Sequence, residues 1–513
     1  SGWTRGKFQD ADQPEYNFLR QVDYCSAASV MIPKQLFNAL GGFDSKYSPA
    51  YYEDTDLAFK VAASGRKVLY QPLSVVTHYE GVTGGTDVSA GAKKYQETNR
   101  ARFASTWSER LAAKPVNGDL DAWERRAEGS RHILVIDHHL PLSDRDSGSL
   151  RMFHILTLLH ELGHEVTFIP DNLADISPYG DDLRRRGIEV IHHPYLTSIR
   201  EFLEANGKHF DVAILSRRDF ARKHMGDVRR FAPQARLVFD TVDLHFLREK
   251  REAELTDNAE LAQNTEENRR LEYELIDEAD ETWVVSPVEK DLLHEERPQA
   301  SIEVISNIVP IADSVAPFGV RRDILFIGSF LHTPNIDAVL FFRREILPQV
   351  HRQLSGLRFY IIGDKAPPEI IALADDKVIV TGYQPDVSIY FDAIKLSVAP
   401  LRYGAGVKGK INQSMGLGVP VVATPVAVEG MSLIDGKEVL LAEDPAVFAA
   451  KLIEAYLSEE LWQRLSRNGL AKTGELFSLE AARDRLAKLF ALGHYEDTST
   501  PCSASPERQL LAS

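Results

Sequence analysis

The stretch GAGVKGKINQSMGLGVPVVAT at 404–424 brings glycines, two lysines and a helix start together in one short segment. The spacing of its apolar residues predicts a helix that follows a strand and carries Lys408 and Lys410 in its opening region. Free backbone N–H groups, the positive end of the helix dipole and two ammonium groups converge there. Gly404 and Gly406 let the backbone approach a ligand closely. The pattern predicts an anion site suited to a diphosphate; its alternative is a glycine-rich connection with solvated lysines.

The same glycines also fit a second pattern. Gly404, Gly406 and Gly409 spell G-x-G-x-x-G, and Glu429 follows about twenty residues later, which is the spacing of a dinucleotide fingerprint. That fingerprint belongs to the first βα unit of a domain, whereas this match lies late in its domain. We therefore give more weight to the anion site.

A second group of residues with chemical potential is a set of carboxylates near the start of the chain. Glu53, Asp54 and Asp56 precede an amphipathic run in SPAYYEDTDLAFKVAASGRKVLYQP (48–72). Acidic side chains at a helix start accept hydrogen bonds from unpaired backbone N–H groups and complement the helix dipole. The same carboxylates could serve as a catalytic base. Spacing alone favours the helix start.

The elements that must position these residues alternate between strands and helices from residue 131 onwards. Such alternation predicts an α/β fold with doubly wound parallel sheets, in which ligands bind at the carboxyl ends of the strands. The predicted strands lie in RHILVIDHH, EVTFIPD, IEVIHH, FDVAILS, ARLVFDTVDLH, ADETWVVSP and IEVISNIV, and then in RRDILFIGSF, LRFYIIGD, KVIVTGY, LSVAPL, VPVVATP and EVLLAED.

The two series of strands predict two tandem Rossmann-like domains, at 131–315 and 316–495, that face each other across a deep cleft. We expect at least one of the helices after residue 444 to pack back on the first domain. Ligand-binding residues are expected in four stretches of the cleft, 137–151, 240–247, 328–337 and 400–430.

The whole chain has 513 residues, which predicts about three domains. Its 44% hydrophobic and 26% charged residues are typical of a soluble globular protein, and its two cysteines, Cys25 and Cys502, indicate a reducing, cytoplasmic location. A formal charge of −16 argues against a nucleic-acid partner. No apolar run approaches the ~20 residues that span a bilayer, so any membrane contact is expected to be peripheral, at the inner face of the cell membrane. We place a linker at 116–130 and a disordered tail at 496–513.

Residues 20–110 carry a resemblance to a known family in DYCSAASVMIPKQLFNALGGFDSKY, the ED-D-L segment and KVLYQPLSVVTHYEG. They resemble the acceptor-side half of a family 2 glycosyltransferase of the GT-A fold, which implies that Asp54 stands at the position of the general base. The metal-binding DxD of that fold is not recognisable, because the DAD at 10–12 follows no buried strand and is interpreted as a solvated turn. The chain starts with Ser-Gly in place of Met. We therefore expect 1–115 to be a truncated GT-A segment cut from a longer polypeptide, with Asp54 idle.

Residues 131–493 resemble a family 4 glycosyltransferase of the GT-B fold through HHLPLSDRDSGSLRM, FDTVDLHFLR, FIGSFLHTPNIDAV, APLRYGAGVKGKI and GVPVVATPVAVEGM. The resemblance implies transfer of a sugar, with retention and without a metal or cofactor, from a UDP-, GDP- or dTDP-linked donor. The implied acceptor is a glycan or lipid-linked oligosaccharide, in the synthesis of bacterial surface polysaccharide such as O-antigen.

The same resemblance assigns roles to residues. Lys410 would neutralise the donor diphosphate, and the main chain at 404–406 would line the donor sugar. Asp240, Asp243 and His245 lie where the family often places a histidine near that sugar. Asp243 and His245 are the candidate catalytic residues, which would orient the sugar; the alternatives are a helix cap for the aspartate and a structural role for the histidine. The full set of candidate donor-binding residues is Asp146, Ser147, Gly148, Ser149, Gly328, Ser329, Asn335, Arg402, Gly404, Ala405, Gly406, Lys408, Lys410, Gln413 and Glu429, and no metal ligand is expected.

The chain also departs from the family pattern. The paired glutamates of the family fall on Ala405 and Gln413, and its Arg and Lys fall within SFLHTPN, where only His332 can be cationic. Donor binding would then rest on Lys408, Lys410 and Arg402. Two alternatives to a glycosyltransferase stay open: a nucleotide-sugar epimerase, and an inactive scaffold of a glycan-assembly complex.

Overall fold

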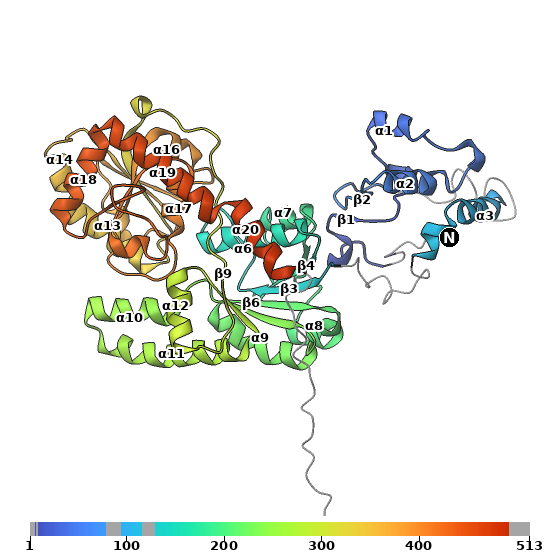
Figure 1. Cartoon of the computed structure of the whole chain (residues 1–513), viewed down its shortest axis with the longest axis horizontal. Coiled ribbons are helices and arrows are strands. Elements are labelled where there is room, and N and C mark those ends of the chain that lie inside the picture. The colour runs from blue at the N-terminus through green and yellow to red at the C-terminus, as the bar shows by residue number, and fades with distance from the viewer. Residues whose placement is uncertain (1–5, 7–8, 78–93, 115–128, 492–513) are drawn as a thin grey trace, which may run out of the picture.

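The computed structural model describes residues 6, 9–77, 94–114 and 129–491. The predicted linker at 116–130 falls almost entirely outside these residues, and the predicted tail at 496–513 falls wholly outside them. The described chain forms an N-terminal segment and two α/β domains (Figure 1). The N-terminal segment stands beside the first domain, on the side away from the second domain.

The N-terminal segment is small, and most of its regular elements are helices. A single antiparallel pair joins its two short strands, and Tyr47, Phe59 and Phe103 form its buried core. A backbone hydrogen bond of 2.9 Å from Leu19 N to Arg184 O ties it to the first domain. Its strands and α-helices are β1 (Arg20–Gln21), α1 (Lys34–Ala39), α2 (Glu53–Ala63), β2 (Leu69–Tyr70), α3 (Tyr95–Thr106) and α4 (Ser108–Ala112).

The first domain is built on a parallel sheet of seven strands in the order β5-β4-β3-β6-β7-β8-β9. Its strands are short apolar runs buried on both faces, which is typical of a parallel sheet covered by helices. The strands are β3 (His132–Asp137), β4 (Glu165–Pro170), β5 (Glu189–Val190), β6 (Val212–Ser216), β7 (Arg236–Asp240), β8 (Glu281–Val284) and β9 (Ile302–Val304).

Helices cover both faces of this sheet. The helix α6 (Ser147–Glu161) shows why they form, since Asp146 caps its start and Met152, Ile155 and Leu159 share one buried face. The others are α7 (Tyr179–Arg185), α8 (Ile199–Asn206), α9 (Arg218–Phe231), α10 (His245–Thr256), α11 (Ala259–Glu278) and α12 (Pro287–Glu296).

The second domain repeats this plan with a parallel six-stranded sheet in the order β12-β11-β10-β13-β14-β15. The strands are β10 (Arg322–Ile327), β11 (Phe359–Ile362), β12 (Val378–Gly382), β13 (Ile394–Ala399), β14 (Val421–Ala423) and β15 (Leu440–Leu441). The helices are α13 (Thr333–Phe341), α14 (Leu347–His351), α15 (Pro368–Ile371), α16 (Ser388–Ala393), α17 (Gly409–Gly416), α18 (Pro445–Leu457) and α19 (Glu459–Phe477).

The last helix, α20 (Leu479–Phe490), packs on the first domain. Its Leu486 and Phe490 are buried in the core that also holds Trp283 of β8. The connection into α20 runs beside the crossing from β9 to β10, because Val309 N donates to Phe477 O at 2.9 Å. The expectation that a C-terminal helix packs back on the first domain is confirmed.

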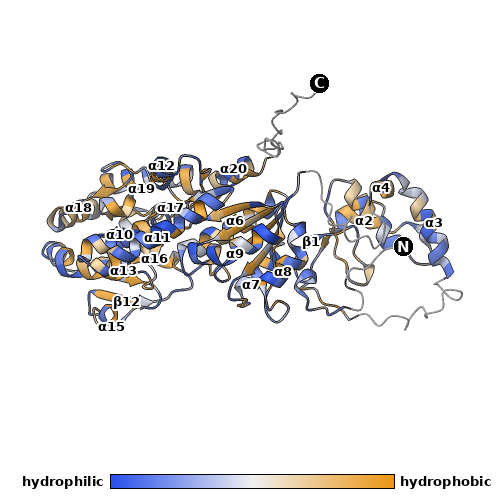
Figure 2. Ribbon diagram, turned by 90° about the horizontal axis from the view of Figure 1, so that it is seen from below, coloured by the Kyte–Doolittle hydropathy of each residue, from blue (hydrophilic) through white to orange (hydrophobic). Residues whose placement is uncertain are grey.

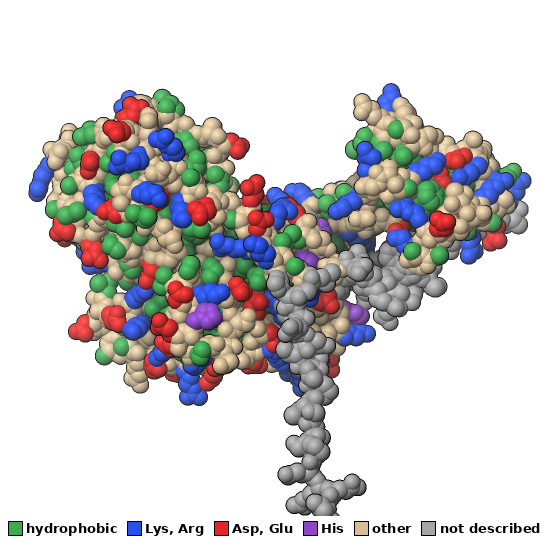
Figure 3. All heavy atoms as spheres, viewed as in Figure 1, with side chains coloured by type: hydrophobic (Ala, Val, Ile, Leu, Met, Phe, Trp, Pro, Cys, Tyr) green, Lys and Arg blue, Asp and Glu red, His purple; other side chains and the backbone are tan. Residues whose placement is uncertain are grey.

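The predicted strand series and the two parallel-sheet domains are confirmed by the structure. Hydrophobic residues follow the strands and the inner helix faces (Figure 2). Acidic and basic side chains are interspersed on the face shown in Figure 3. Within the described ranges, no helix has both the length and the apolar character needed to cross a bilayer.

Candidate functional site between the two domains

Each sheet has one point at which its strand order reverses, and such points are where ligands bind in open α/β sheets. In the first domain the reversal lies between β3 and β6, whose carboxyl ends carry Asp137 and Arg217. In the second domain it lies between β10 and β13, which lead into Gly328 and the turn at 400–408. Three of the four predicted stretches, 137–151, 328–337 and 400–430, therefore start at these reversal points, whereas 240–247 follows the neighbouring strand β7.

Two helix N-termini meet across the domain boundary. Asp146 caps α6, with its carboxylate accepting hydrogen bonds from Ser149 N at 2.9 Å and from Ser149 Oγ at 2.7 Å. A Cβ atom placed on Gly409, the first residue of α17, would lie only 2.3 Å from the Cβ of Ser147. Because the two first turns touch, the positive ends of both helix dipoles converge there, as an anion site requires.

The glycine turn before α17 depends on its glycines and on Lys408. Gly404 and Gly406 have φ values of 147° and 67°, which disfavour other residues. The Lys408 ammonium donates hydrogen bonds of 2.6 Å to the carbonyls of Ala405 and Gly406. Burial lowers the pKa of Lys408 to about 8, against the opposing effect of the nearby Glu289 carboxylate. Lys408 therefore fixes the turn that the resemblance placed at the donor sugar.

Lys410 stands one residue into α17 and has no carboxylate partner among the described residues. Its ammonium donates to Asn335 Oδ1 and lies 4.5 Å from the ring centre of Phe326. It also lies 3.1 Å from where a Cβ on Gly328 would sit. Asn335 is held in turn, since its amide nitrogen donates to Ser329 O at 2.6 Å. Burial and the neighbouring Lys408 charge lower the pKa of Lys410 to about 7, as expected for a cation that lacks a counter-ion.

Asp243 reaches the glycine turn from the first domain. A Cβ on Gly406 would lie 3.2 Å from the Cβ of Asp243, and Arg248 donates a hydrogen bond to the Asp243 carboxylate. Burial raises the pKa of Asp243, but Arg248 and His245 lower it more, so the net shift is downward. The group is an ionised hydrogen-bond acceptor beside the turn.

His245 begins α10 and is engaged by a buried carboxylate. Glu272 accepts hydrogen bonds of 3.0 Å from the backbone N–H groups of His245 and Phe246, and it lies 3.1 Å from His245 Nδ1. His245 Nε2 lies 3.8 Å from Asp243 Oδ1. Asp240, by contrast, is fully buried in an ion pair with Arg151 at 2.8 and 2.9 Å, which removes it from the ligand-facing surface.

Two further bridges join the domains at the edges of the site. Arg251 of α10 donates to both carboxylate oxygens of Glu429 and, at 2.6 Å, to the carbonyl of Gly404. On the other edge, the Tyr383 hydroxyl donates to Asp144, and the Arg145 guanidinium lies 3.6 Å from the centre of the Tyr383 ring. Glu429 is therefore a residue that holds the domains together.

The remaining candidate residues of the second domain have fewer contacts with the first domain. Arg402 forms an ion pair with Asp337 of α13 and lies 5.2 Å from the ring centre of Phe341. Gln413 follows Lys410 by three residues on α17, which places both on one helix face. His332 is the N-cap residue of α13 and is exposed.

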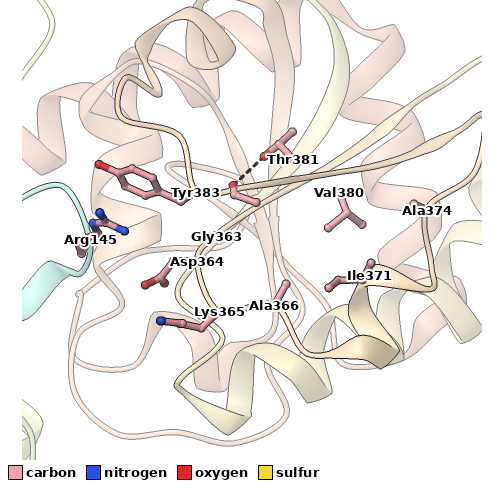
Figure 4. A pocket seen from close by; sticks show the side chains of 11 residues that line it. Arg145, Gly363, Asp364, Lys365, Ala366, Ile371, Ala374, Val380, Thr381 and Tyr383 are labelled. Atoms are coloured by element: carbon pink, nitrogen blue, oxygen red, sulfur yellow. Dashed lines mark hydrogen bonds between the residues drawn. The ribbon is translucent and has the colours of Figure 1, made fainter.

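A cavity of about 560 Å³ opens at the carboxyl ends of β11 and β12 (Figure 4). Arg145 of the first domain faces Tyr383, Asp364 and Lys365 at one end, and Ile371, Ala374 and Val380 line the other. A pocket with both apolar walls and a few polar groups suits an organic ligand with polar edges. Arg145 lies within the predicted stretch 137–151, but the sequence analysis missed the lining residues of the second domain, although Asp364, Lys365 and Tyr383 directly follow two predicted strands.

Arg217 is another residue that the sequence analysis missed. Its Nε donates to Asp137 Oδ1 at 2.9 Å, and its backbone φ of 70° is unusual for a residue with a side chain. Burial raises the pKa of Asp137, but Arg217 and His138 lower it to about 2. The signal that could have found Arg217 is its place directly after β6, at the strand-order reversal.

The N-terminal carboxylates lie apart from this site. Asp54 is the second residue of α2, where it accepts hydrogen bonds of 3.1 Å from Ala27 N and 2.7 Å from Thr55 N. Asp56 is fully buried. Asp10 and Asp12 lie in an exposed turn, as predicted for the DAD sequence.

Residues 321–458 match the family model for glycosyl transferases group 1. The chain is 17% identical to sucrose-phosphate synthase from Thermosynechococcus elongatus, over 70% of this chain and 98% of that one, with a TM-score of 0.54. It is 12% identical to S. aureus TarM, solved with UDP (70% and 100% covered, TM-score 0.53), and 13% identical to Anabaena HepE, solved with UDP and glucose (71% and 100%, TM-score 0.53).

The two α/β domains of this chain have the GT-B fold. The fold and the family model together support a glycosyltransferase of the group 1 type. Two curated relatives match shorter stretches. An uncharacterised protein of the cps region of Klebsiella pneumoniae is 23% identical over 140 residues, and a rhamnosyltransferase of Mycobacterium tuberculosis, acting on N-acetylglucosaminyl-diphospho-decaprenol, is 29% identical over 85 residues. These matches cover 26% and 17% of this chain and span only 36% and 26% of the relatives' own lengths.

Proposed function

We propose that this protein is a retaining, family 4-like glycosyltransferase that moves a sugar from a nucleotide-sugar to a glycan or lipid-linked acceptor in bacterial surface polysaccharide synthesis. The observation that carries the proposal is the meeting of two helix N-termini beside Lys410, a cation without a carboxylate partner among the described residues. A diphosphate is the ligand whose charge and size match this convergence of donors.

The diphosphate would act as the leaving group. Negative charge grows on its oxygens as the bond to the sugar breaks, and donors already aimed at that place stabilise the transition state more than the ground state. Lys410 and the amides that open α6 and α17 supply such donors without a metal ion. The first turn of each helix is fixed by contacts within the protein, so little reorganisation is needed.

The rest of the donor has places in the same site. The cavity beside Arg145 and Tyr383 would take the nucleoside end, and the turn at 404–406, with Asp243 opposite, would take the sugar. Two of the solved structures that share this fold contain UDP, which favours UDP-linked donors as the first to test. Gln413 can still offer an amide to the ribose.

The acceptor and the cellular location are proposed from the weaker similarity to the curated relatives. One curated relative belongs to a cps region, and the other is a rhamnosyltransferase of N-acetylglucosaminyl-diphospho-decaprenol. We propose by analogy a cytoplasmic enzyme with peripheral contact to the membrane that carries such an acceptor. The N-terminal segment is proposed to correspond to the acceptor-side part of a GT-A domain.

The experiment is incubation with UDP-, GDP- and dTDP-sugars, with and without acceptor glycans, while nucleotide release is followed. Acceptor-dependent release of a nucleoside diphosphate supports the proposal, and NMR of the new linkage tests retention. Conversion of the donor sugar without acceptor and without release would identify an epimerase. Nucleotide binding without turnover on any acceptor would favour the scaffold.

A further inference from the structure

We propose that Arg217 contacts the donor diphosphate from the first domain, opposite Lys410, so that the leaving group is held by one cation from each domain. This inference rests on the proposed function. It assigns a donor-binding role to a residue outside all the sequence motifs described above.

The first reason is position and backbone conformation. Arg217 follows β6 at the strand-order reversal. Its backbone φ is 70°, a value that residues other than glycine rarely adopt. Strained backbone is retained mainly where function fixes it. The conformation allows Arg217 N to bond Asp240 O at 2.8 Å while the side chain reaches Asp137 of the neighbouring strand.

The second reason is the unused donor capacity of the guanidinium. Arg217 Nε is bonded to Asp137, but across the described part of the chain no hydrogen bond engages either terminal nitrogen. The side chain keeps 20% of its surface exposed. A guanidinium oriented through one edge, with its other donors accessible, is ready to bind two oxygens of a phosphate.

The third reason is the path from Arg217 to Lys410. Arg217 Nη2 lies 3.1 Å from where a Cβ on Gly148 would sit, so the guanidinium rests against the first turn of α6. The adjacent Ser147 touches Gly409, which directly precedes Lys410. Arg217 and Lys410 therefore flank the same two helix N-termini from opposite domains.

The fourth reason is electrostatic. A cation beside the positive end of a helix dipole is unfavourable unless an anion joins them. Asp137 neutralises one edge of the guanidinium, and Asp146 is already committed to the cap of α6. Asp243, the other carboxylate near Arg217, is paired with Arg248. An anion bound at the helix N-termini would complete this arrangement.

The test compares Arg217→Ala with Arg222→Ala, an exposed arginine on the following helix, by calorimetric titration of the full chain. The probes are UDP, GDP and dTDP, and the nucleoside of whichever binds most tightly. We expect Arg217→Ala to weaken diphosphate binding by about tenfold or more and to leave nucleoside binding unchanged. Arg222→Ala should bind like the wild type.

Loss of Arg217 leaves Asp137 buried without its cation, so Arg217→Ala combined with Asp137→Asn provides a second variant in case the first fails to fold. A double-mutant cycle with Lys410→Ala is expected to show coupling, since both cations would touch one diphosphate. Wild-type diphosphate affinity in the folded variant, an equal loss of nucleoside affinity, or losses that simply multiply would overturn the inference. A wild-type protein that binds no nucleoside diphosphate at all would instead refute the proposed function.

Discussion

At the scale of single residues, Lys410 combines partial burial with the lack of any described carboxylate partner. Asn335 and the face of Phe326 hold its ammonium in place without neutralising it. A phosphate bound there would accept a charge-assisted hydrogen bond from Lys410 without displacing a carboxylate, so the binding free energy of that contact would not be reduced by competition.

Lys410→Ala should therefore weaken nucleoside diphosphate affinity by about ten- to a hundredfold, corresponding to about 1.5–3 kcal/mol for a hydrogen bond to a charged group. Calorimetric titration of the folded variant measures this. Lys437→Ala, at an exposed lysine of the same domain, should leave the dissociation constant unchanged. An unchanged constant for Lys410→Ala would move the anion site elsewhere.

The pKa of about 7 for Lys410 predicts a pH dependence of binding. Only the ammonium form attracts a diphosphate, so affinity should be full below this pKa and fall as the pH rises through 7. Below about pH 6 the terminal phosphate itself takes up a proton, which places the optimum between roughly 6 and 7. Titrations over pH 6–9 check this, and Lys410→Arg, which stays charged, should flatten the decline above pH 7.

At the scale of elements, the start of α2 separates two neighbouring carboxylates. Asp54 accepts hydrogen bonds from backbone N–H groups at the surface. Asp56 is fully buried, where it accepts from Tyr47 and Trp107 and pairs with Lys60 at 2.9 Å. Asp54 and Asp56 therefore form a matched pair for substitution, with one carboxylate near the surface and the other buried.

Asp54→Asn should leave glycosyl transfer unchanged and cost less than about 1 kcal/mol of stability, because only a helix-terminus interaction weakens. Asp56→Ala should destabilise the N-terminal segment by about 3–5 kcal/mol, because it leaves buried donors and a cation without their partner. Turnover assays and thermal unfolding distinguish the two. A large loss of activity in Asp54→Asn would bring residues 1–115 into the chemistry.

The elements themselves could be predicted from the sequence because each strand is a short apolar run and helices such as α6 carry a cap and one apolar face. The edge strands β5 and β15 are only two residues long, which is shorter than the apolar runs indicated. The Arg217–Asp137 contact could not be predicted, because it joins residues 80 positions apart and depends on β6 lying next to β3. The partners of Lys408 and Lys410 likewise require the folded loop.

At the scale of the whole molecule, α20 makes the first domain depend on the end of the chain. Leu486 is fully buried in the first-domain core. Leu486→Ala should lower the free energy of unfolding by about 2–5 kcal/mol, as for other buried leucines. Urea denaturation measures this, with Lys488→Ala as the exposed control on the same helix. Equal midpoints for the two variants would contradict the docking of α20.

The chain crosses between the domains twice, from β9 to β10 and from α19 to α20. The hydrogen bond from Val309 N to Phe477 O ties the two crossings together, so they form one hinge. Two crossings allow one domain to rotate about the line that joins them, and they resist rotation of the domain about other axes. They also make the connection redundant. A protease that cuts the segment between β9 and β10 would leave the two halves associated through α20, so the nicked protein should still migrate as one species until it is denatured.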